Sequence, residues 1–472
     1  MKRGMVGCVI LILTLFSCSS CVKKGLYKGP DEEPSDEKVY VYPYGNERDN
    51  VVAEITVQTD GTVDLDQVSV EIPKLKYNKS WLFLLSLDDC RQDAFSCGWA
   101  AINGKPLSPK YYYDIDHLKA GDLPPDVYYV GKTLGSTDGA GNEVRFSFAI
   151  TLSAEWDWMD LDPVVKVGFE ENYFRFFMKS GLSWKNVIEM LHYGTGIAFH
   201  NVRTKDESNI DSIGYHFMTT QTIIQDKLSG RGCKFLAEPD GNKAYITAAQ
   251  GYKPIQIMTA QAGAETLYPF NTERDLEKTV MARTFASEAG IKQIVEEQLR
   301  LQKEKRRAVQ IGMHGVGKDW VEFLQWMNDT YGKDGDDSVW FTSLEEYFEY
   351  NYYRIHGSVE KRVEGNDVKI TVRMPSGQYF YYPSVTVNLK GLDKQKVKGI
   401  ISGNTVTGLS SGAYDEGTMI NLDCRKFLVE HATHFVEQYE DDATESNRND
   451  ALYFVNMLKD SAKKTELLKR IK

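Results

Sequence analysis

Short apolar runs alternate with amphipathic segments through the middle of the chain, from residue 76 to residue 354. The run 81–87 is continuously apolar, as in a buried strand, while 184–191 places its apolar side chains on one helical face behind a plausible N-cap, Ser183. Further apolar runs predict strands at 146–152, 197–199, 234–237, 254–258, 308–313 and 339–342, and amphipathic segments predict helices ending near 228 and spanning 287–307 and 320–327. Alternation of buried strands with helices is typical of a parallel sheet or a (β/α) barrel.

The pattern changes on both sides of this region. Residues 39–75 contain period-two segments separated by turn residues, which predict a small β module. Residues 355–424 return to period-two segments and predict a β-sandwich-like accessory domain. In residues 425–472 apolar side chains recur at helical spacing, so we expect a helical tail.

The N-terminus carries a different signal. Two basic residues precede an apolar run, 5–16, that is too short to span a bilayer and is typical of a signal peptide. Residues 15–18, Leu-Phe-Ser-Cys, resemble a bacterial lipobox, which implies a signal peptide of residues 1–17 and lipidation of Cys18; Cys21 is the weaker alternative. We therefore expect an exported protein that is lipid-anchored to the bacterial cell envelope, at the outer membrane and facing the periplasm or the outside.

Composition narrows the possible partners. Residues 18–38 are acidic and almost free of apolar side chains, so they cannot bury enough surface to fold and predict a disordered tether. The formal net charge of −11 disfavours nucleic acid and anionic lipid headgroups as ligands, which leaves the lipid on Cys18 as the membrane contact. The 27 tyrosines suit a sugar ligand, although core packing is the commoner use of such rings.

Candidate chemistry lies where predicted strands end. Asp88 and Asp89 follow the run 81–87, His200 follows 197–199, and His314 follows 308–313. Reactive side chains of a parallel barrel lie at the carboxyl ends of its strands. Adjacent carboxylates raise each other's pKa, and a divalent cation relieves that cost: one can bind the metal while the other accepts a proton from water.

This arrangement resembles the NodB-homology polysaccharide deacetylases. Residues 86–90, Ser-Leu-Asp-Asp-Cys, are similar to the first motif of that family, Thr-Phe-Asp-Asp-Gly. The resemblance implies that Asp88 is the general base and Asp89 a metal ligand. The run that ends in His314 is similar to the last motif, an apolar strand followed by histidine, and implies that His314 is the general acid.

Two other motifs are matched only in part. The family's second motif is His-Ser/Thr-x-x-His after a short strand; His200 corresponds to the first histidine and implies a metal ligand, but Thr204 stands in place of the second. Asp206, Asp211, His192, His216 or water would have to complete the ligand set. Of the third motif, Arg-x-Pro-Tyr, only Pro239 is matched, so the arginine that would orient the base is not evident.

The resemblance implies a distorted (β/α) barrel of the NodB deacetylase type over residues 76–354, with a divalent metal, zinc before others. Metal-activated water would attack the acetyl carbonyl of an N- or O-acetylated polysaccharide, Asp88 would take its proton, and His314 would protonate the leaving group. Thr204 and the degraded third motif favour an alternative, a catalytically inactive glycan-binding surface lipoprotein that retains the deacetylase fold.

Two further sequence patterns suggest other binding sites. Residues 312–318 fit a phosphate-binding GxxxxGK loop, but Asp319 replaces the Ser or Thr that would hold magnesium, so we reject that interpretation. His431 and His434 are three residues apart in the helical tail and could bind metal, yet we expect them on its surface.

Overall fold

The computed structural model describes residues 39–46, 49–108, 110–165, 173–176 and 181–471. The predicted signal peptide 1–17, the lipidation site Cys18 and the tether 18–38 lie outside the described residues. Within the described ranges, no helix combines the length and apolarity needed to cross a membrane. The unit that contains the elements below runs from residue 41 to residue 472.

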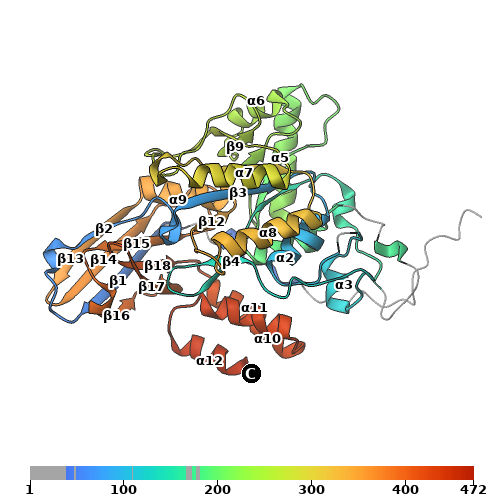
Figure 1. Ribbon diagram of the computed structural model, residues 1–472. Helices are drawn as coiled ribbons and strands as arrows, with labels where there is room; N and C mark the ends of the chain where they lie inside the picture. The colour runs from blue at the N-terminus through green and yellow to red at the C-terminus, as the bar shows by residue number, and fades with distance from the viewer. Residues whose placement is uncertain (1–38, 47–48, 109, 166–172, 177–180, 472) are drawn as a thin grey trace, which may run out of the picture. The chain divides into compact units, whose positions relative to one another are not determined.

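A curled parallel sheet forms the centre of this unit (Figure 1). Its strand order is β10-β9-β8-β7-β6-β3-β11, and β12 pairs with β3 beside β6. Beyond β10, a parallel bridge joins Thr284 to Ile311 of β11, so the two ends of the strand order meet. This is the sheet expected of a (β/α) barrel. The strands are β3 (Trp81–Leu87), β6 (Ala149–Leu152), β7 (Gly196–Phe199), β8 (Phe235–Ala237), β9 (Ile257–Ala260), β10 (Thr279–Ala282), β11 (Val309–Met313) and β12 (Val339–Thr342).

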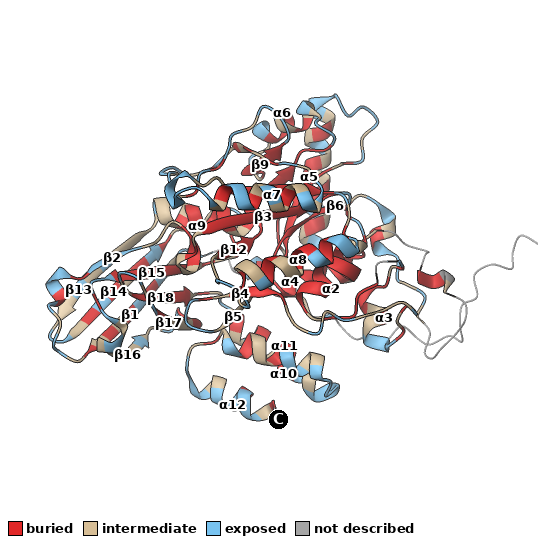
Figure 2. Ribbon diagram, in the orientation of Figure 1, coloured by how far each residue is buried: buried red, intermediate tan, exposed pale blue. Residues whose placement is uncertain are grey.

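Helices connect these strands and cover the sheet, and Figure 2 colours both exposed and buried residues along them. Several begin at a side-chain cap: Ser183 accepts a hydrogen bond from the Asn186 amide, and Ser343 accepts one from the Glu346 amide, which satisfies N–H groups that the first turn leaves open. The helices are α4 (Trp184–His192), α5 (Ile210–Lys227), α6 (Lys243–Gly251), α7 (Glu288–Leu299), α8 (Lys318–Tyr331) and α9 (Leu344–His356), with the shorter α2 (Ala100–Ile102) and α3 (Ile115–Ala120) in the insertion after β3.

Two antiparallel four-stranded sheets follow the barrel, ordered β13-β14-β1-β16 and β17-β18-β15-β2. The expectation of a separate β module in residues 39–75 is wrong, because β1 pairs with β14 and β16, and β2 pairs with β15. A strand must satisfy its backbone groups against neighbours, and a segment this short has too few strands to do so alone. The strands are β1 (Val51–Thr59), β2 (Ser69–Glu71), β13 (Ser358–Glu364), β14 (Asp367–Met374), β15 (Ser384–Lys390), β16 (Val397–Ser402), β17 (Gly408–Tyr414) and β18 (Gly417–Asp423); β4 (Gly135–Thr137) and β5 (Glu143–Arg145) form a separate hairpin.

The helical tail consists of α10 (Leu428–Asp441), α11 (Glu445–Asn456) and α12 (Ala462–Arg470). Its predicted apolar face is buried, and Phe435 of α10 stacks on Phe454 of α11 with ring centroids 3.9 Å apart. The prediction that His431 lies on the helix surface is wrong. This side chain is buried, and the centroid of its ring lies 5.3 Å from that of His192 at the end of α4. Packing against the barrel overrides the polar character of the residue.

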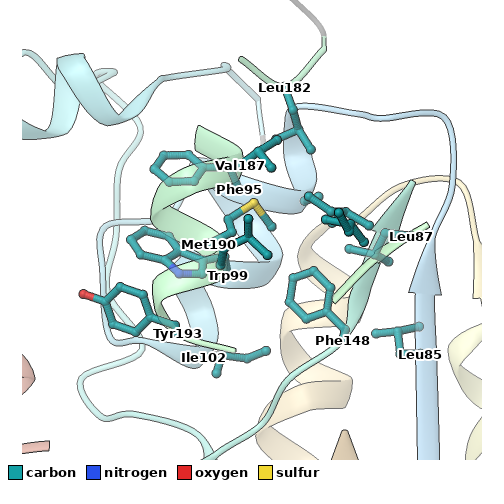
Figure 3. Packing of buried hydrophobic residues seen from close by; sticks show 14 of the residues in the cluster. Leu85, Leu87, Phe95, Trp99, Ile102, Phe148, Leu182, Val187, Met190 and Tyr193 are labelled. Atoms are coloured by element: carbon teal, nitrogen blue, oxygen red, sulfur yellow. The ribbon is translucent and has the colours of Figure 1, made fainter. Parts of the chain in front are cut away.

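Dense aromatic packing supports the segment that follows β3. A π-helical turn, η4 (Ala94–Trp99), continues into α2 and packs against α4 (Figure 3). Phe95 and Trp99 stack at 4.6 Å, and the edge of Trp99 meets Tyr193 at 5.2 Å. Leu85 and Leu87 of β3 belong to the same buried cluster. The segment between β3 and η4 is therefore held at both ends by buried structure.

Candidate active site

The predicted site residues lie at the carboxyl ends of three strands of the parallel sheet. Asp88 and Asp89 follow β3, His200 follows β7, and His314 follows β11. The amide of Asp88 donates a 2.7 Å hydrogen bond to the carbonyl of Met313, so the ends of β3 and β11 lie side by side. The parallel sheet thus places all four residues at one edge, as the positions of the apolar runs predict.

Asp89 and His200 are brought close together. The Nε2 atom of His200 lies 3.6 Å from Asp89 Oδ1 and 4.0 Å from Asp88 Oδ2. The other ring nitrogen, Nδ1, is 2.8 Å from the carbonyl oxygen of Ala237, which can only accept a hydrogen bond, so Nδ1 carries the proton. The Nε2 atom therefore faces the two carboxylates, where a shared cation would stabilise the arrangement.

The spacing of these donors tests whether a metal fits. Two zinc ligands at ~2.1 Å from the ion lie about 3.4 Å apart in a tetrahedral shell. The 3.6 Å between Asp89 Oδ1 and His200 Nε2 agrees with two ligands of one divalent ion. Among the described residues, however, no three His, Cys, Asp or Glu side chains gather closely enough to hold a metal. Within the described residues, the spacing is that of two metal ligands and not of a complete ligand set.

Of the suggested third ligands, Asp206 accepts hydrogen bonds from Ser208, and two others are also unsuited to complete the site. The hydroxyl of Thr204 is 2.6 Å from that of Ser212, and His216 Nδ1 pairs with Glu155 at 2.5 Å. His192 ends α4, before β7 begins, and therefore lies at the opposite end of the strands. Asp211, which is exposed in the first turn of α5, water and substrate remain as sources of further ligands.

The backbone at Asp89 is unusual. Asp89 and Cys90 have φ values of 64° and 50°, in the left-handed region that residues with side chains rarely adopt. Cys90 occupies the position where the family motif has glycine, which adopts this conformation without steric cost. Hydrogen bonding with His200 lowers the pKa of Asp89, so its carboxylate is ionised at neutral pH. The turn thus presents a charged oxygen to His200.

Arg283 is the functional residue that the sequence pattern missed. It follows β10, and its guanidinium NH1 donates to Asp88 Oδ1 at 2.9 Å while NH2 donates to the carbonyl of Glu238 at 2.6 Å. Asp88 is 1% exposed, and no described residue donates a hydrogen bond to its Oδ2, although Arg283 NH1 is also 2.9 Å from that oxygen. The arginine expected near Pro239 is therefore supplied by another strand.

The same rule that located the other residues would have found Arg283, because it is the first polar side chain after a strand. The strand itself was not predicted: β10 has only four residues, Thr-Val-Met-Ala, and their burial alternates. A run this short cannot be distinguished from a loop by periodicity.

His314 lies at the open rim of the site. It is exposed, and its ring stacks on Phe285 with centroids 5.0 Å apart and planes 23° apart. Arg283 also contacts the Phe285 ring, with its guanidinium carbon 5.0 Å from the ring centroid. Gly312 makes room for Phe285, because a Cβ at residue 312 would lie 2.6 Å from the Phe285 ring. Phe285 therefore positions the imidazole beside the Asp88–Arg283 pair.

Comparison with protein families agrees with this geometry. The sequence model of a family described as "Putative polysaccharide deacetylase" matches residues 53–472. This chain belongs to that polysaccharide deacetylase family. The predicted family is thus confirmed, and the match extends through the sandwich and the tail, so the deacetylase-family unit is larger than the barrel. No curated protein matches the chain.

Proposed function

We propose that this deacetylase-family protein hydrolyses acetyl groups on N- or O-acetylated polysaccharide, with Asp88 as general base and His314 as general acid. The observation that carries the proposal is the meeting of Asp88, Asp89 and His200 within 4.0 Å, beside a buried arginine. A polysaccharide substrate follows from the family.

Metal dependence is part of the proposal. Asp89 and His200 would hold the ion, because their donor atoms have the spacing of two ligands of one cation. When bound, a divalent metal such as zinc supplies a Lewis acid that activates water and polarises the acetyl carbonyl.

The remaining residues handle protons. Arg283 NH1 lies 2.9 Å from both carboxylate oxygens of Asp88 and would orient this group to accept a proton from the attacking water. His314 stands at the exposed rim, where it can donate a proton to the departing amine or alkoxide. Phe285 stacks on the ring of His314 and contacts Arg283, which in turn contacts Asp88. The same phenylalanine therefore helps to position both the acid and the base.

An inactive glycan-binding protein is the second candidate. It is favoured by one observation: Thr204 bonds to Ser212, and no described group of three metal-ligand side chains exists. Loss of a protein ligand weakens metal affinity, and a site with too little metal would bind sugar without hydrolysing it.

Acetate release separates the two. The purified protein should bind divalent metal and release acetate from acetylated chitooligosaccharide or acetylated xylan. We expect Asp88→Asn to keep the metal and lose about 10²- to 10⁴-fold in kcat, whereas Asp89→Ala should lose the metal. Asp319→Asn, an exposed change on α8, is the matched control. Metal-free protein that releases no acetate from either substrate would overturn the hydrolase in favour of glycan binding.

We also propose export and lipid attachment through Cys18, on the basis of the leader sequence alone. Incorporation of labelled fatty acid into the wild-type protein, but not into Cys18→Ala, is the expected result. Equal labelling of both would instead point to Cys21.

A further inference from the structure

A cavity of about 510 Å³ lies at the end of the sheet opposite the candidate active site. Lys76 precedes β3, Arg145 precedes β6, and Tyr193 precedes β7, and all three line it. Asp88 follows β3, and a strand of this length spans about 20 Å. The cavity is therefore separate from the carboxyl-end site, and its volume is within the range of small-molecule sites.

Three parts of the chain form its wall. The barrel contributes the residues before its strands, the sandwich contributes β17 and β18 through Ser410 and Asn421, and the tail contributes α11 through Asn449 and Tyr453. Buried ion pairs hold the tail in place, with Asp450 bonded to Arg145 at 2.6 Å. The part of the cavity wall formed by α11 therefore depends on the tail staying packed against the barrel.

The cations along the cavity are paired with carboxylates of the protein, and the Asp138 carboxylate accepts hydrogen bonds from Asn142 and from the Ala140 amide. Lys76 Nζ lies 2.9 Å from Glu346, and Arg425 lies 2.7 Å from Asp423. Arg145 pairs with Asp450 and faces the ring of Tyr453 at 4.1 Å. A cavity whose cations already have carboxylate partners offers little to a phosphate or a metal ion, because binding either would require breaking a buried pair. Its ligand should be neutral.

The other lining groups suit hydroxyl-rich molecules. Asn142, Asn449 and Asn456 line the cavity and are partly or fully exposed, and each amide can both donate and accept hydrogen bonds. Tyr77 and Tyr382 are half-buried there and supply part of its apolar wall. Sugar rings present hydroxyl groups at their edges and C–H groups on their faces, which these two kinds of side chain match.

We propose that this cavity binds a neutral oligosaccharide, at a site distinct from the one that performs hydrolysis. The proposal does not depend on deacetylase activity. Such a site would hold one segment of a polysaccharide on the protein while another segment is free to meet the carboxyl-end site, and it would raise the local substrate concentration.

Saturation-transfer NMR tests this with a panel of cellobiose, maltose, xylobiose, mannobiose and N,N′-diacetylchitobiose. The Asp88→Asn protein is used, so that no sugar is consumed. Asn449→Trp fills the cavity from an exposed helix position, and Glu437→Trp adds the same ring at an exposed position on α10 that does not line it. We expect at least one disaccharide to bind, with an affinity roughly tenfold weaker in Asn449→Trp and unchanged in Glu437→Trp.

Two results would overturn the proposal: no transfer to any of the five sugars, or binding that Asn449→Trp leaves unchanged. In the second case the sugar occupies the carboxyl-end site. Acetate release is measured separately on the wild-type protein, so failure of the oligosaccharide cavity and failure of the hydrolase are distinguishable.

Discussion

Replacing Asp450 with alanine should release the helical tail. The Asp450 carboxylate is 3% exposed and is bonded to Lys105, to Arg145 at 2.6 Å and to the Tyr193 hydroxyl at 2.8 Å. Lys105, Arg145 and Tyr193 belong to the barrel region, whereas Asp450 is on α11. This cluster links α11 to the barrel, and alanine leaves Lys105 without its carboxylate partner, while Arg145 keeps Glu143 at 3.5 Å.

The cost follows chiefly from Lys105, which loses its carboxylate partner. Removing one partner of a buried ion pair costs about 3–5 kcal/mol, because the remaining charge is buried without compensation. Since ~1.4 kcal/mol is a factor of ten, the open tail should become roughly 10²- to 10⁴-fold more populated. Burial alone would raise the pKa of Asp450, but Lys105 and Arg145 outweigh it and lower that pKa. The stabilisation is therefore complete at pH 7 and is lost as acid protonates the folded carboxylate.

Hydrogen exchange of the amides in residues 428–470 measures the opening directly. Asp460→Ala is the matched control: Asp460 is fully exposed in the same tail and pairs with Lys464 at 3.3 Å, so its loss should leave exchange nearly unchanged. Equal exchange in the two variants would refute the reasoning, because it would mean that the buried cluster contributes no more than a solvated pair.

Other predictions concern the site and the pH response. Arg283→Lys keeps a charge but loses the planar fork, so kcat should fall roughly 10- to 100-fold while metal stoichiometry, measured alongside, is unchanged; loss of the metal would contradict a positioning role. Trp156 is 44% exposed in the loop after β6, and Trp156→Ala should raise KM about threefold or more if the ring stacks on sugar, with an unchanged KM as the contrary result. Burial, followed by the nearby His192, lowers the pKa of His434 to about 4. The unfolded chain binds this proton near pH 6.5, so tail stability should fall between pH 6.5 and 4, and hydrogen exchange that is flat over this range would contradict it.

Local pattern was enough to place much of the candidate site. The strand predicted at 81–87 is β3 with the same bounds, and the runs ending before His200 and His314 are β7 and β11. A parallel sheet brings carboxyl ends to one edge, so the side chain after each run had to lie near the others. The roles assigned to Asp88, Asp89, His200 and His314 stay predictions until activity and metal binding are measured.

The hydrophobic pattern could not predict which strands pair when they are far apart in the sequence. Val51 of β1 lies opposite Met374 of β14, and nothing in either segment identifies the other as its partner. The same holds for Arg283, whose approach to Asp88 depends on where a four-residue strand joins the sheet. Apolar periodicity reports only which face of a segment is buried, so the sequence by itself determined the elements and their strand-end residues. Tertiary packing decided which segments meet: the sandwich, the arginine beside the base and the cavity beneath the barrel.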